Sequence, residues 1–383
     1  MKLFLVAGEA SGDRLGAALM EGLKTLAPGV AFAGVGGPLM QAQGLQSLFP
    51  MDELSVMGIA EILPKYRKLR RRLHQTAEAV LADPPDALIT IDSPDFCLRV
   101  ARLVRARRPE QRTIHYVAPS VWAWRPGRAA KMAEVIDHVL ALLPFEPPLM
   151  QAVGMSCDFV GHPVVAEPRA TAAEAQAFRE THGIGKAPLI LVLPGSRRGE
   201  VGRLGPVFGA ALGLVVAARP EARVVLPTVA HVAGAVRAMA AAWPGAPVVV
   251  ETADDKRAAF AAADVALAAS GTVSLELAAN AVPMVIGYNF NRLTWEIIKR
   301  RALIDTVTLV NLVSDTRVVP EFLGPACRAE AIAPALLRMM AAGPERAAEL
   351  DAMAVTMQRL GAGGEAPGLR AARSVLGALG HRA

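Results

Sequence analysis

Cysteine is scarce in this sequence. The three cysteines, Cys97, Cys157 and Cys327, lie far apart in a chain of 383 residues, and none belongs to a Cys-x-x-Cys pair. Disulfide frameworks and structural zinc sites use several cysteines at short spacing, so the sequence argues against both. It favours reduced structural thiols in a cytoplasmic protein without a metal site.

Long apolar runs are missing as well. The apolar run at the amino terminus breaks at Gly8, which is too early for a signal peptide. No other stretch reaches the ~18 uninterrupted apolar residues of a membrane-spanning helix. Any contact with a membrane is therefore expected to be peripheral.

The composition that is present excludes a disordered chain. Hydrophobic residues make up 53% of the sequence and charged residues 20%, and the length favours two domains over one. Lysine and arginine outnumber the acidic residues by 41 to 35, which gives a formal net charge of +6. This basic balance suits an anionic small molecule, a nucleic acid or an anionic membrane surface, and it does not choose among them.

Short apolar runs alternate with amphipathic or alanine-rich segments along nearly the whole chain. The runs are continuous, which is typical of parallel strands buried on both faces, and their alternation with helices predicts a doubly wound α/β fold. The expected strands are 2–7, 31–35, 87–92, 113–118, 138–143, 189–193, 223–227, 247–251, 264–269 and 283–288. Examples of the expected helices are 12–26, 66–82, 95–108, 200–218, 231–242 and 272–280.

A segment rich in proline and ending in a glycine turn, residues 163–188, divides the chain. We place one Rossmann-like domain at 1–166 and a second at 167–364. The last segment, 365–383, is expected to be a helix that packs back on the first domain. Ligands of such folds bind outside the carboxyl ends of the strands, so the expected site is a cleft between the two domains.

The stretch "LPGSRRGEV" follows one expected strand and opens an expected helix. Backbone N–H groups around Ser196 would be free to bind an anion at the helix start, and Arg197 or Arg198 would add a planar guanidinium. The alternative is an ordinary helix start with solvated arginines. We favour a phosphate site.

A second junction, "ASGTVSLELA", repeats this arrangement after a later strand. Ser270, Gly271 and Thr272 would form another anion-binding turn. Glu276 lies one turn further on the same helix face, where it would accept hydrogen bonds from sugar hydroxyls, as in ribose recognition. Its alternative role is a first-turn acid that interacts with the helix dipole, and the spacing does not separate the two.

The amino-terminal turn "GEASGD" has small residues but no G-x-G-x-x-G fingerprint, and no acidic residue closes the next strand. This pattern argues against a dinucleotide site. It favours a turn that holds a second substrate, formed by Ser11, Gly12 and Asp13.

Asp92 ends an apolar strand in "ALITIDSPDF". A carboxylate there would face the cleft, and partial burial would raise its pKa toward that of a working general base. The alternative is that Asp92 or Ser93 caps the following helix, with Pro94 at its first position. Ser93 and Asp95 suit the capping and first-turn roles, which leaves Asp92 without a structural task.

Two further stretches have the character of a surface. Trp122 and Trp124, in "HYVAPSVWAWRPGR", are spaced by two in a proline-flanked loop, which suggests a surface platform that faces the membrane rather than core packing. In "AEILPKYRKLRRRLHQ", Arg70, Arg71 and Arg72 lie among apolar residues, a pattern typical of a helix on an anionic membrane. A solvated basic face is the alternative, and no nucleic-acid-binding motif accompanies these charges.

Taken together and in order, these motifs resemble those of the lipid-A-disaccharide synthase family, bacterial glycosyltransferases of the GT-B type, over essentially the whole chain. The resemblance is carried by "AGEASGD", "VMGIAEILP", "IDSPDF", "IHYVAPSVWAWRPGR", "LPFE", "FVGHP", "LPGSRRGEV" and "ASGTVSLE". It implies two Rossmann-like domains facing across a cleft. The implied reaction joins UDP-2,3-diacylglucosamine to 2,3-diacylglucosamine 1-phosphate, with a β-1,6 link, inversion and release of UDP, and with no metal or other cofactor.

The same resemblance implies the roles of individual residues. Asp92 would be the base, and Met57 would lie on the acceptor side with the amino-terminal turn. The implied UDP-binding residues are Ser196, Arg197, Ser270, Gly271, Thr272, Glu276 and, in "TLVNLV", Asn311. The implied location is the cytoplasmic face of the inner membrane, on anionic lipid and with no nucleic-acid partner, and a homodimer is compatible with the pattern.

Three rival interpretations predict different behaviour. Another UDP-sugar enzyme of the same fold, a 2-epimerase or a polyprenyl-linked sugar transferase, would share the glycine-bearing junctions. A non-catalytic protein of the membrane surface would bind nucleotide without turnover. A dehydrogenase would need the fingerprint that the amino-terminal turn lacks.

Overall fold

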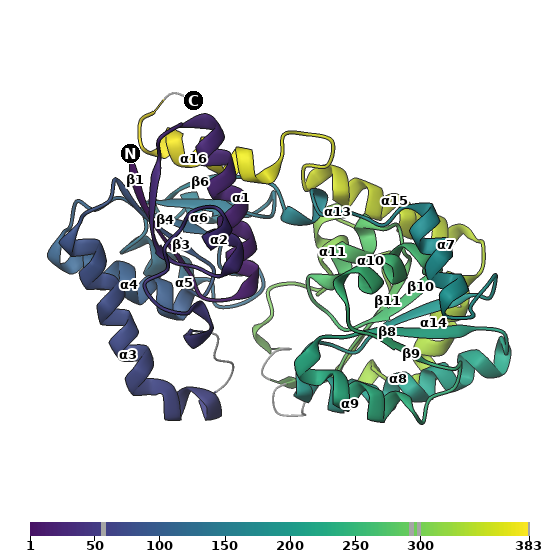
Figure 1. Ribbon diagram of the computed structural model, residues 1–383. Coiled ribbons are helices and arrows are strands. Elements are labelled where there is room, and N and C mark those ends of the chain that lie inside the picture. Colours follow the sequence, from purple (N-terminus) through teal and green to yellow (C-terminus); the bar gives the residue numbers. More distant parts are fainter. Residues whose placement is uncertain (55–58, 291–294, 297–299, 382–383) are drawn as a thin grey trace. The chain divides into compact units, whose positions relative to one another are not determined.

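The structure, a computed structural model (Figure 1), describes residues 1–54, 59–290, 295–296 and 300–381. The chain forms two compact units, of which the first comprises Met1–Ala166 with Gly363–Ala383 and the second Glu167–Ala362. The division expected from the sequence has its boundaries after residues 166 and 364, and the units divide after residues 166 and 362.

The first unit is built on a parallel six-stranded sheet with the strand order β2-β1-β3-β4-β5-β6. Its strands are β1 (Lys2–Ala7), β2 (Ala31–Val35), β3 (Ala87–Ile91), β4 (Thr113–Tyr116), β5 (His138–Ala141) and β6 (Ser156–Phe159). Its helices are α1 (Ala10–Leu26), α2 (Pro38–Ala42), α3 (Ile59–Ala82), α4 (Pro94–Arg107), α5 (Gly127–Ala133), α6 (Pro147–Gln151) and α16 (Pro367–Ala378), with 3-10 turns η1 (Met51–Glu53) and η2 (Pro163–Val165).

Both faces of this sheet are buried, as its continuous apolar runs predict. In β1, Leu3 and Leu5 pack into a cluster with side chains of α1 and α16. Phe4 and Val6 point to the other face and pack with side chains of α3 and α4. The alternation of side chains along a strand thus supplies two cores from one apolar run.

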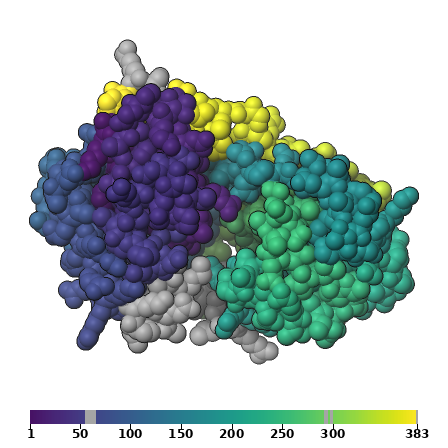
Figure 2. Space-filling view, viewed as in Figure 1, coloured from purple at the N-terminus to yellow at the C-terminus, as the bar shows by residue number. Residues whose placement is uncertain are grey.

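The last helix, α16, returns to the first unit and lies against α1, where the yellow carboxyl-terminal residues touch the purple ones (Figure 2). A Cβ on Gly22 of α1 would lie 2.6 Å from the carbonyl oxygen of Gly368 in α16. A Cβ on Gly368 would lie 2.6 Å from the carbonyl oxygen of Ala18. The two helices therefore meet backbone to backbone, and the predicted packing of the carboxyl-terminal helix on the first domain is confirmed.

The second unit has its own parallel sheet, with the strand order β12-β11-β10-β7-β8-β9. Its strands are β7 (Leu189–Leu193), β8 (Arg223–Pro227), β9 (Val248–Val250), β10 (Val265–Ala268), β11 (Met284–Tyr288) and β12 (Glu321–Leu323). The helices described by residue are α7 (Ala172–Thr181), α8 (Arg198–Ala218), α9 (Ala230–Ala240), α10 (Ala253–Ala262), α11 (Val273–Ala279), α13 (Leu309–Ser314), α14 (Ala329–Met340) and α15 (Pro344–Arg359), with the 3-10 turn η3 (Gly324–Ala326).

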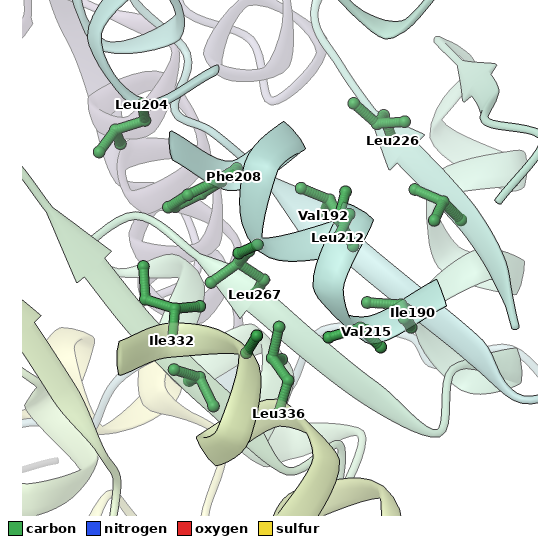
Figure 3. Packing of buried hydrophobic residues seen from close by; sticks show 14 of the residues in the cluster. Ile190, Val192, Leu204, Phe208, Leu212, Val215, Leu226, Leu267, Ile332 and Leu336 are labelled. Carbon is green, nitrogen blue, oxygen red and sulfur yellow. The ribbon is translucent and has the colours of Figure 1, made fainter. Parts of the chain in front are cut away.

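The helices α8 and α14 pack on this sheet and form one of its cores (Figure 3). By length and composition, α8 is long and apolar enough to cross a membrane. In the structure its Leu204, Phe208 and Leu212 are buried against β7 and α14. We therefore interpret α8 as a core helix of the α/β unit.

Every strand expected from the sequence is present, with ends that shift by at most two residues. The strands β6 and β12 are not predicted. Both lie at an edge of a sheet and include polar residues, Ser156 and Asp158 in β6 and Glu321 in β12. Edge strands carry a weaker apolar signal because less of their surface is buried.

Candidate functional site

In each unit the order of the strands reverses at one point of the sheet, and ligands of such folds bind there, outside the carboxyl ends of the strands. This point lies between β1 and β3 in the first unit and between β7 and β10 in the second. The turns "GEASGD" and "IDSPDF" follow β1 and β3, and "PGSRRGEV" and "SGT" follow β7 and β10. The fold therefore brings the predicted turns together in pairs, one pair in each unit.

Asp92 directly follows β3 and has a left-handed backbone, with a φ of 52°. Its N–H donates to the carbonyl of Tyr116, at the end of β4, at 2.9 Å. Burial raises the pKa of its carboxyl, while hydrogen bonds from the N–H of Ser93 and the hydroxyl of Ser11 act in the opposite direction. The structure thus joins Ser11 of the first turn to Asp92 of the second and makes the carboxylate more basic than an ordinary aspartate.

The prediction that the Ser93 side chain caps the following helix is wrong. Ser93 stands at the N-cap position of α4 with a φ of 42°, but its hydroxyl makes no capping bond and donates to the Glu9 carboxylate at 3.5 Å. Gly8 allows this approach, since a Cβ there would lie 2.6 Å from the Ser93 hydroxyl oxygen. The hydroxyl therefore links the two turns instead of closing the helix. Asp95 is exposed in the first turn of α4, as expected.

Asp13 has a structural role, which corrects its prediction as part of the turn for a second substrate. Its side chain is 3% exposed, and its carboxylate accepts the N–H groups of Gly37, Leu39 and Met40 at 2.8, 3.0 and 3.0 Å. These buried N–H groups at the start of α2 need an acceptor, and Asp13 supplies it.

The other residues predicted to belong to this turn differ in their exposure to solvent. Gly12 is buried against β3, where a Cβ would lie 3.4 Å from the carbonyl oxygen of Ile91. Ser11 is exposed and is the residue of the turn that reaches Asp92. Met57 lies outside the described residues.

The two tryptophans predicted as a surface platform have different environments. Trp124 is 41% exposed, and the Arg125 guanidinium lies over its ring at 4.0 Å. Trp122 donates its indole N–H to the buried Glu146 at 3.1 Å and packs edge-on against the ring of Phe145. Trp122 is therefore half-buried and an anchor of its own loop, and a contact of this residue with a membrane stays a prediction.

The three arginines predicted to face a membrane also differ in their exposure and pairing. Arg70 and Arg71 are exposed on α3. Arg72 forms a bidentate pair with Glu53 at 2.7 and 3.0 Å, and both side chains are 16% exposed. Its guanidinium is already used, so Arg72 does not belong to the exposed basic face.

In the second unit, the turn after β7 presents Ser196, Arg197 and Arg198 as exposed residues. The helix α8 begins at Arg198, and Arg197 is its N-cap residue. The Arg197 guanidinium, 62% exposed, pairs with the Glu200 carboxylate at 3.3 Å. An exposed pair of this kind contributes less than about 1 kcal/mol, so Arg197 can turn to a bound anion at little cost.

Glu200 is a residue of this turn that the sequence analysis does not single out. Its carboxylate accepts the backbone N–H of Arg197 and the hydroxyl of Tyr288, both at 3.3 Å. Gly195, with a φ of 105°, makes room for it, since a Cβ there would lie 2.5 Å from a carboxylate oxygen of Glu200. The available signal was its position three residues after the N-cap, as in a capping box.

The turn after β10 places Gly271 and Thr272 at the surface. Gly271 has a φ of 153°, and no atom of the described residues lies within 4 Å of the place where a Cβ would be. Glu276, in α11, pairs with Lys256 of α10 at 2.5 Å. A ribose contact at Glu276 stays a prediction, in which the Lys256 ammonium would share the carboxylate.

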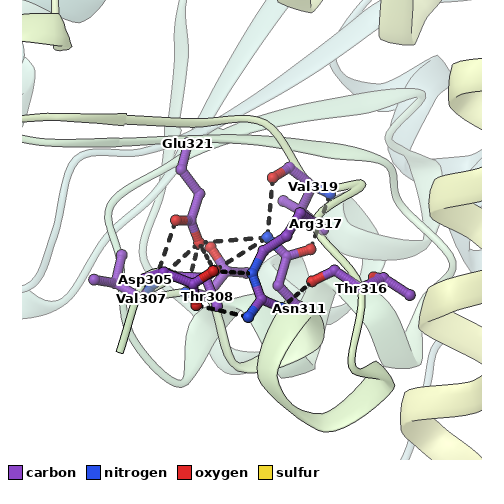
Figure 4. A network of polar contacts seen from close by, with 9 residues as sticks. Asp305, Val307, Thr308, Asn311, Thr316, Arg317, Val319 and Glu321 are labelled. Carbon is purple, nitrogen blue, oxygen red and sulfur yellow. Dashed lines mark hydrogen bonds and ion pairs between the residues drawn. The ribbon is translucent and has the colours of Figure 1, made fainter. Parts of the chain in front are cut away.

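Asn311 is 1% exposed, and its amide is used within the second unit (Figure 4). The Nδ2 group donates to the hydroxyl of Thr306 at 3.2 Å and to the carbonyl of Val319 at 3.1 Å. The Oδ1 atom accepts the N–H of Val319 at 3.0 Å. Both amide hydrogens are therefore used and the side chain is buried, which corrects the predicted direct contact of Asn311 with a UDP-sugar.

The hydrogen bonds around Asn311 extend to the turn after β10 through the backbone of the two residues before α13. Glu321 of β12 accepts the N–H groups of Val307 and Thr308 at 3.1 and 2.7 Å. The carbonyl of Val307 in turn accepts the hydroxyl of Ser270 at 3.3 Å. Asn311 and Glu321 therefore hold the segment against which Ser270 of the second turn rests.

The cysteines Cys97, Cys157 and Cys327 are buried and free, which confirms the predicted structural thiols. Within the described ranges, no group of three or more His, Cys, Asp and Glu side chains is placed to share a metal ion.

The chain matches known proteins over nearly its whole length. The model of the lipid-A-disaccharide synthetase family matches residues 3–363. The lipid-A-disaccharide synthase of Ruegeria pomeroyi is 63% identical to the chain over 387 residues, which cover 99% of this chain and 96% of that protein. The lipid-A-disaccharide synthase of Rhodospirillum centenum is 47% identical over 382 residues, which cover 99% and 95%.

Solved structures share the fold at low sequence identity. The UDP-GlcNAc 2-epimerase of Neisseria meningitidis, bound to UDP-GlcNAc, has a TM-score of 0.67 at 11% identity, with 99% of each chain covered. The calicheamicin glycosyltransferase has a TM-score of 0.61 at 17% identity, with 99% of this chain and 98% of that chain covered. The predicted α/β fold, with two parallel sheets of the kind found in glycosyltransferases and UDP-sugar enzymes, is confirmed.

Proposed function

The chain belongs to the lipid-A-disaccharide synthetase family, and on this premise we propose that it transfers a diacylglucosaminyl group from UDP-2,3-diacylglucosamine to 2,3-diacylglucosamine 1-phosphate. The 6-hydroxyl oxygen of the acceptor attacks C1 of the donor sugar. The bond from C1 to the diphosphate oxygen breaks, and UDP leaves with the bonding electrons. Attack opposite the leaving group inverts the anomeric centre and forms the β-1,6 link.

The observation that carries this proposal is the Asp92 carboxylate at the reversal point between β1 and β3. Burial raises its pKa, so it accepts a proton more readily than an ordinary aspartate. In the proposed step it takes the proton of the 6-hydroxyl group as the oxygen attacks. The hydroxyl of Ser11 and the N–H of Ser93 orient the carboxylate for this transfer.

Negative charge grows on the diphosphate as UDP leaves, and the turn after β7 is suited to stabilise it. Arg197 is exposed and only weakly paired. It stands at the N-cap position of the 21-residue helix α8, whose first N–H groups favour an anion. We propose that Arg197, Ser196 and these N–H groups bind the diphosphate without a metal ion, with the turn around Ser270 completing the nucleotide site.

Both proposed substrates carry acyl chains, so we propose that the protein works as a peripheral protein on the cytoplasmic face of the inner membrane. The exposed face of α3 supports this location, with Arg70, Arg71 and Tyr66, whose side chain is 53% exposed. Trp124, which is 41% exposed, is a second candidate for contact with the membrane.

The release of UDP from the two acylated substrates by purified protein tests the proposal. UDP should form only when both are present, and a chelator should not change the rate. UDP-GlcNAc, which lacks the acyl chains, should not replace the donor. Conversion of UDP-GlcNAc to its 2-epimer would instead identify an epimerase of the same fold, and nucleotide binding without turnover would identify a non-catalytic protein.

A further inference from the structure

One buried carboxylate connects two loops at the carboxyl edge of the first sheet. Glu146, in the "LPFE" stretch after β5, is 4% exposed. Its Oε1 atom accepts the indole N–H of Trp122 at 3.1 Å. Its Oε2 atom accepts the N–H groups of Leu142 and Leu143 at 3.2 and 2.9 Å. Both oxygens are thus used to tie the loop after β4 to the loop after β5.

The loop that Glu146 holds begins next to Asp92. We call residues 117–126, which follow β4, the tryptophan loop. Tyr116, the last residue of β4, accepts the N–H of Asp92. Val117 comes next, and its N–H donates to the carbonyl of Leu140, in β5, at 3.0 Å. The tryptophan loop therefore begins one residue after the contact with Asp92, and a shift of the loop would displace the backbone at that contact.

The backbone of the tryptophan loop is strained at both ends. Val117 has a φ of 86°, a conformation that β-branched residues rarely adopt, and Arg125 has a φ of 53°. Such conformations persist only where the surrounding structure enforces them, and they cluster at functional sites. The hydrogen bond from Trp122 to Glu146, together with the edge-on packing of Trp122 against Phe145 at 5.4 Å, supplies this restraint.

A carboxylate is an expensive way to fill this position. An apolar side chain would fill the space without the cost of burying a charge. Burial raises the pKa of Glu146 to about 7, so its charge changes near neutral pH. The neighbouring thiol of Cys157, in β6, does not titrate there, because burial and then the charge of Glu146 raise its pKa to about 12. A residue this costly points to a requirement for hydrogen-bond acceptors at this place.

We propose that Glu146 is a positioning residue of the transfer reaction: through Trp122 it fixes the tryptophan loop beside Asp92, where this loop forms one wall of the acceptor site. The role at the acceptor rests on the proposed function, whereas the restraint on Trp122 does not. Glu146 acts through Trp122 and Asp92 and does not itself contact the substrate. Because a misplacement of ~1 Å can cost about 100-fold in rate, a released loop should slow the transfer.

Three variants and one control test the role in the reaction. In Glu146→Gln the amide keeps one acceptor oxygen but turns an N–H group toward one of its former donors. We expect kcat/KM to fall by about 10- to 100-fold, mostly in kcat and acceptor KM, with the donor KM unchanged. Trp122→Phe removes the donor and should have a similar effect. The double variant should be no worse than the single ones, because the two residues act as one unit.

The matched control is Glu134→Gln, which changes an exposed glutamate of the same unit, 62% exposed, and should leave kcat/KM within about twofold of the wild type. Losses for Glu146→Gln and Trp122→Phe that multiply in the double variant would overturn the proposal. So would a Glu146→Gln enzyme within twofold of the wild type.

The restraint itself is measured without turnover, by the ¹H–¹⁵N resonance of the Trp122 indole. Its absence in Trp122→Phe assigns it. In the wild type it should shift with a midpoint near pH 7 as Glu146 ionises, and in Glu146→Gln it should be independent of pH and exchange faster with water. If Glu146→Gln left both the position of this resonance and its exchange with water unchanged, the restraint would be overturned. An inactive wild type with this titration intact would count against the proposed function alone.

Discussion

At the scale of the single residue, Asp92 allows chemistry to be separated from folding. Its φ of 52° lies in the left-handed region that asparagine occupies more readily than other residues except glycine. The Asp92→Asn protein should therefore fold normally. We expect its kcat to fall by a factor on the order of 100 or more, since a general base supplies that much, and UDP release from the two acylated substrates measures it.

The matched control is Asp95→Asn, three residues further on and exposed in α4, which should keep normal turnover. Because burial raises the pKa of Asp92, kcat/KM of the wild type should decline toward acid pH around a pKa above ~3.9, the ordinary aspartate value. A folded Asp92→Asn enzyme with normal turnover would rule out Asp92 as the base.

Arg197 and Arg198 are neighbours with different expected effects. Arg197 stands at the N-cap position of α8, where its guanidinium would be close to an anion bound at the helix start, whereas Arg198 is the first residue of the helix itself. We expect Arg197→Ala to lower kcat and raise the donor KM by about 10- to 100-fold, because the charge on the leaving UDP loses the guanidinium and keeps only the N–H groups of the turn. Arg198→Ala should have a smaller effect. Equal losses would show that both bind the diphosphate.

Glu349 tests electrostatics away from the site. It lies in α15 with no exposed surface, and its Oε1 accepts the N–H of Met284 at 2.7 Å. Burial raises the pKa of this carboxyl from 4.5 to about 8. A raised acid pKa means that the folded state resists ionisation, so the contribution of this group to stability is fully present below pH 4.5 and is lost as the pH rises toward 8.

Glu349→Gln should therefore stabilise the second unit, by an amount that grows with pH to about 3 kcal/mol near pH 7. Thermal unfolding of both proteins between pH 5 and 8 measures the widening gap. Glu345→Gln, on the same helix and 58% exposed, should show no such trend. A gap that is constant with pH would contradict the raised pKa.

At the scale of the element, α3 tests the contact with the membrane. Arg70 and Arg71 are exposed, whereas Arg72 pairs with Glu53 and Leu73 packs on the core of the first unit. We therefore expect the Arg70→Ser, Arg71→Ser double variant to bind anionic liposomes about 10- to 30-fold more weakly at low salt, at ~1 kcal/mol for each arginine. Liposome sedimentation measures it, and high salt should reproduce the defect.

The matched control replaces two exposed arginines of α4, Arg102 and Arg107, by serine and thus changes the net charge equally. If both double variants lose the same affinity, the effect is one of net charge and α3 is a solvated face. Arg72→Ser should instead destabilise the fold, since it leaves the carboxylate of Glu53 without its bidentate partner.

At the scale of the whole molecule, the first unit depends on the last helix of the chain. Removal of residues after 362 deletes α16, which buries Ala371, Ala372, Val375 and Leu376 against α1 and the sheet. It also removes the Ser374 hydroxyl that bonds the ring of His138 at 2.8 Å. The apolar area alone contributes about 5 kcal/mol, which is comparable to the stability of a typical domain.

We therefore expect the truncated protein to lose the folding transition of the first unit in calorimetry and to keep that of the second. Arg373→Ala, an exposed position on the same helix, should shift stability by less than about 1 kcal/mol. A first unit that unfolds at its normal temperature after truncation would show that α16 is dispensable.

The sequence by itself determined the two parallel sheets, the turns at their carboxyl ends and the return of the last helix. These features have local signals: continuous apolar runs mark strands buried on both faces, and glycine and serine mark the turns. The edge strands β6 and β12 were not predicted, because polar residues interrupt their apolar runs. Asp92 could be singled out because a strand end with a carboxylate is visible in one short stretch.

Only the tertiary structure decided which polar groups in those stretches are available. Asp13, Trp122, Arg72 and Asn311 look like site residues in the sequence, yet each already has a hydrogen-bond partner in the fold. The partners of Asp13 and Trp122, Gly37 and Glu146, lie 24 residues away along the chain. A contact at that distance leaves no local pattern, because it depends on how separate strands and helices are brought together. Exposure and hydrogen bonding are properties of the packed chain, and they separate a functional side chain from a structural one of the same kind.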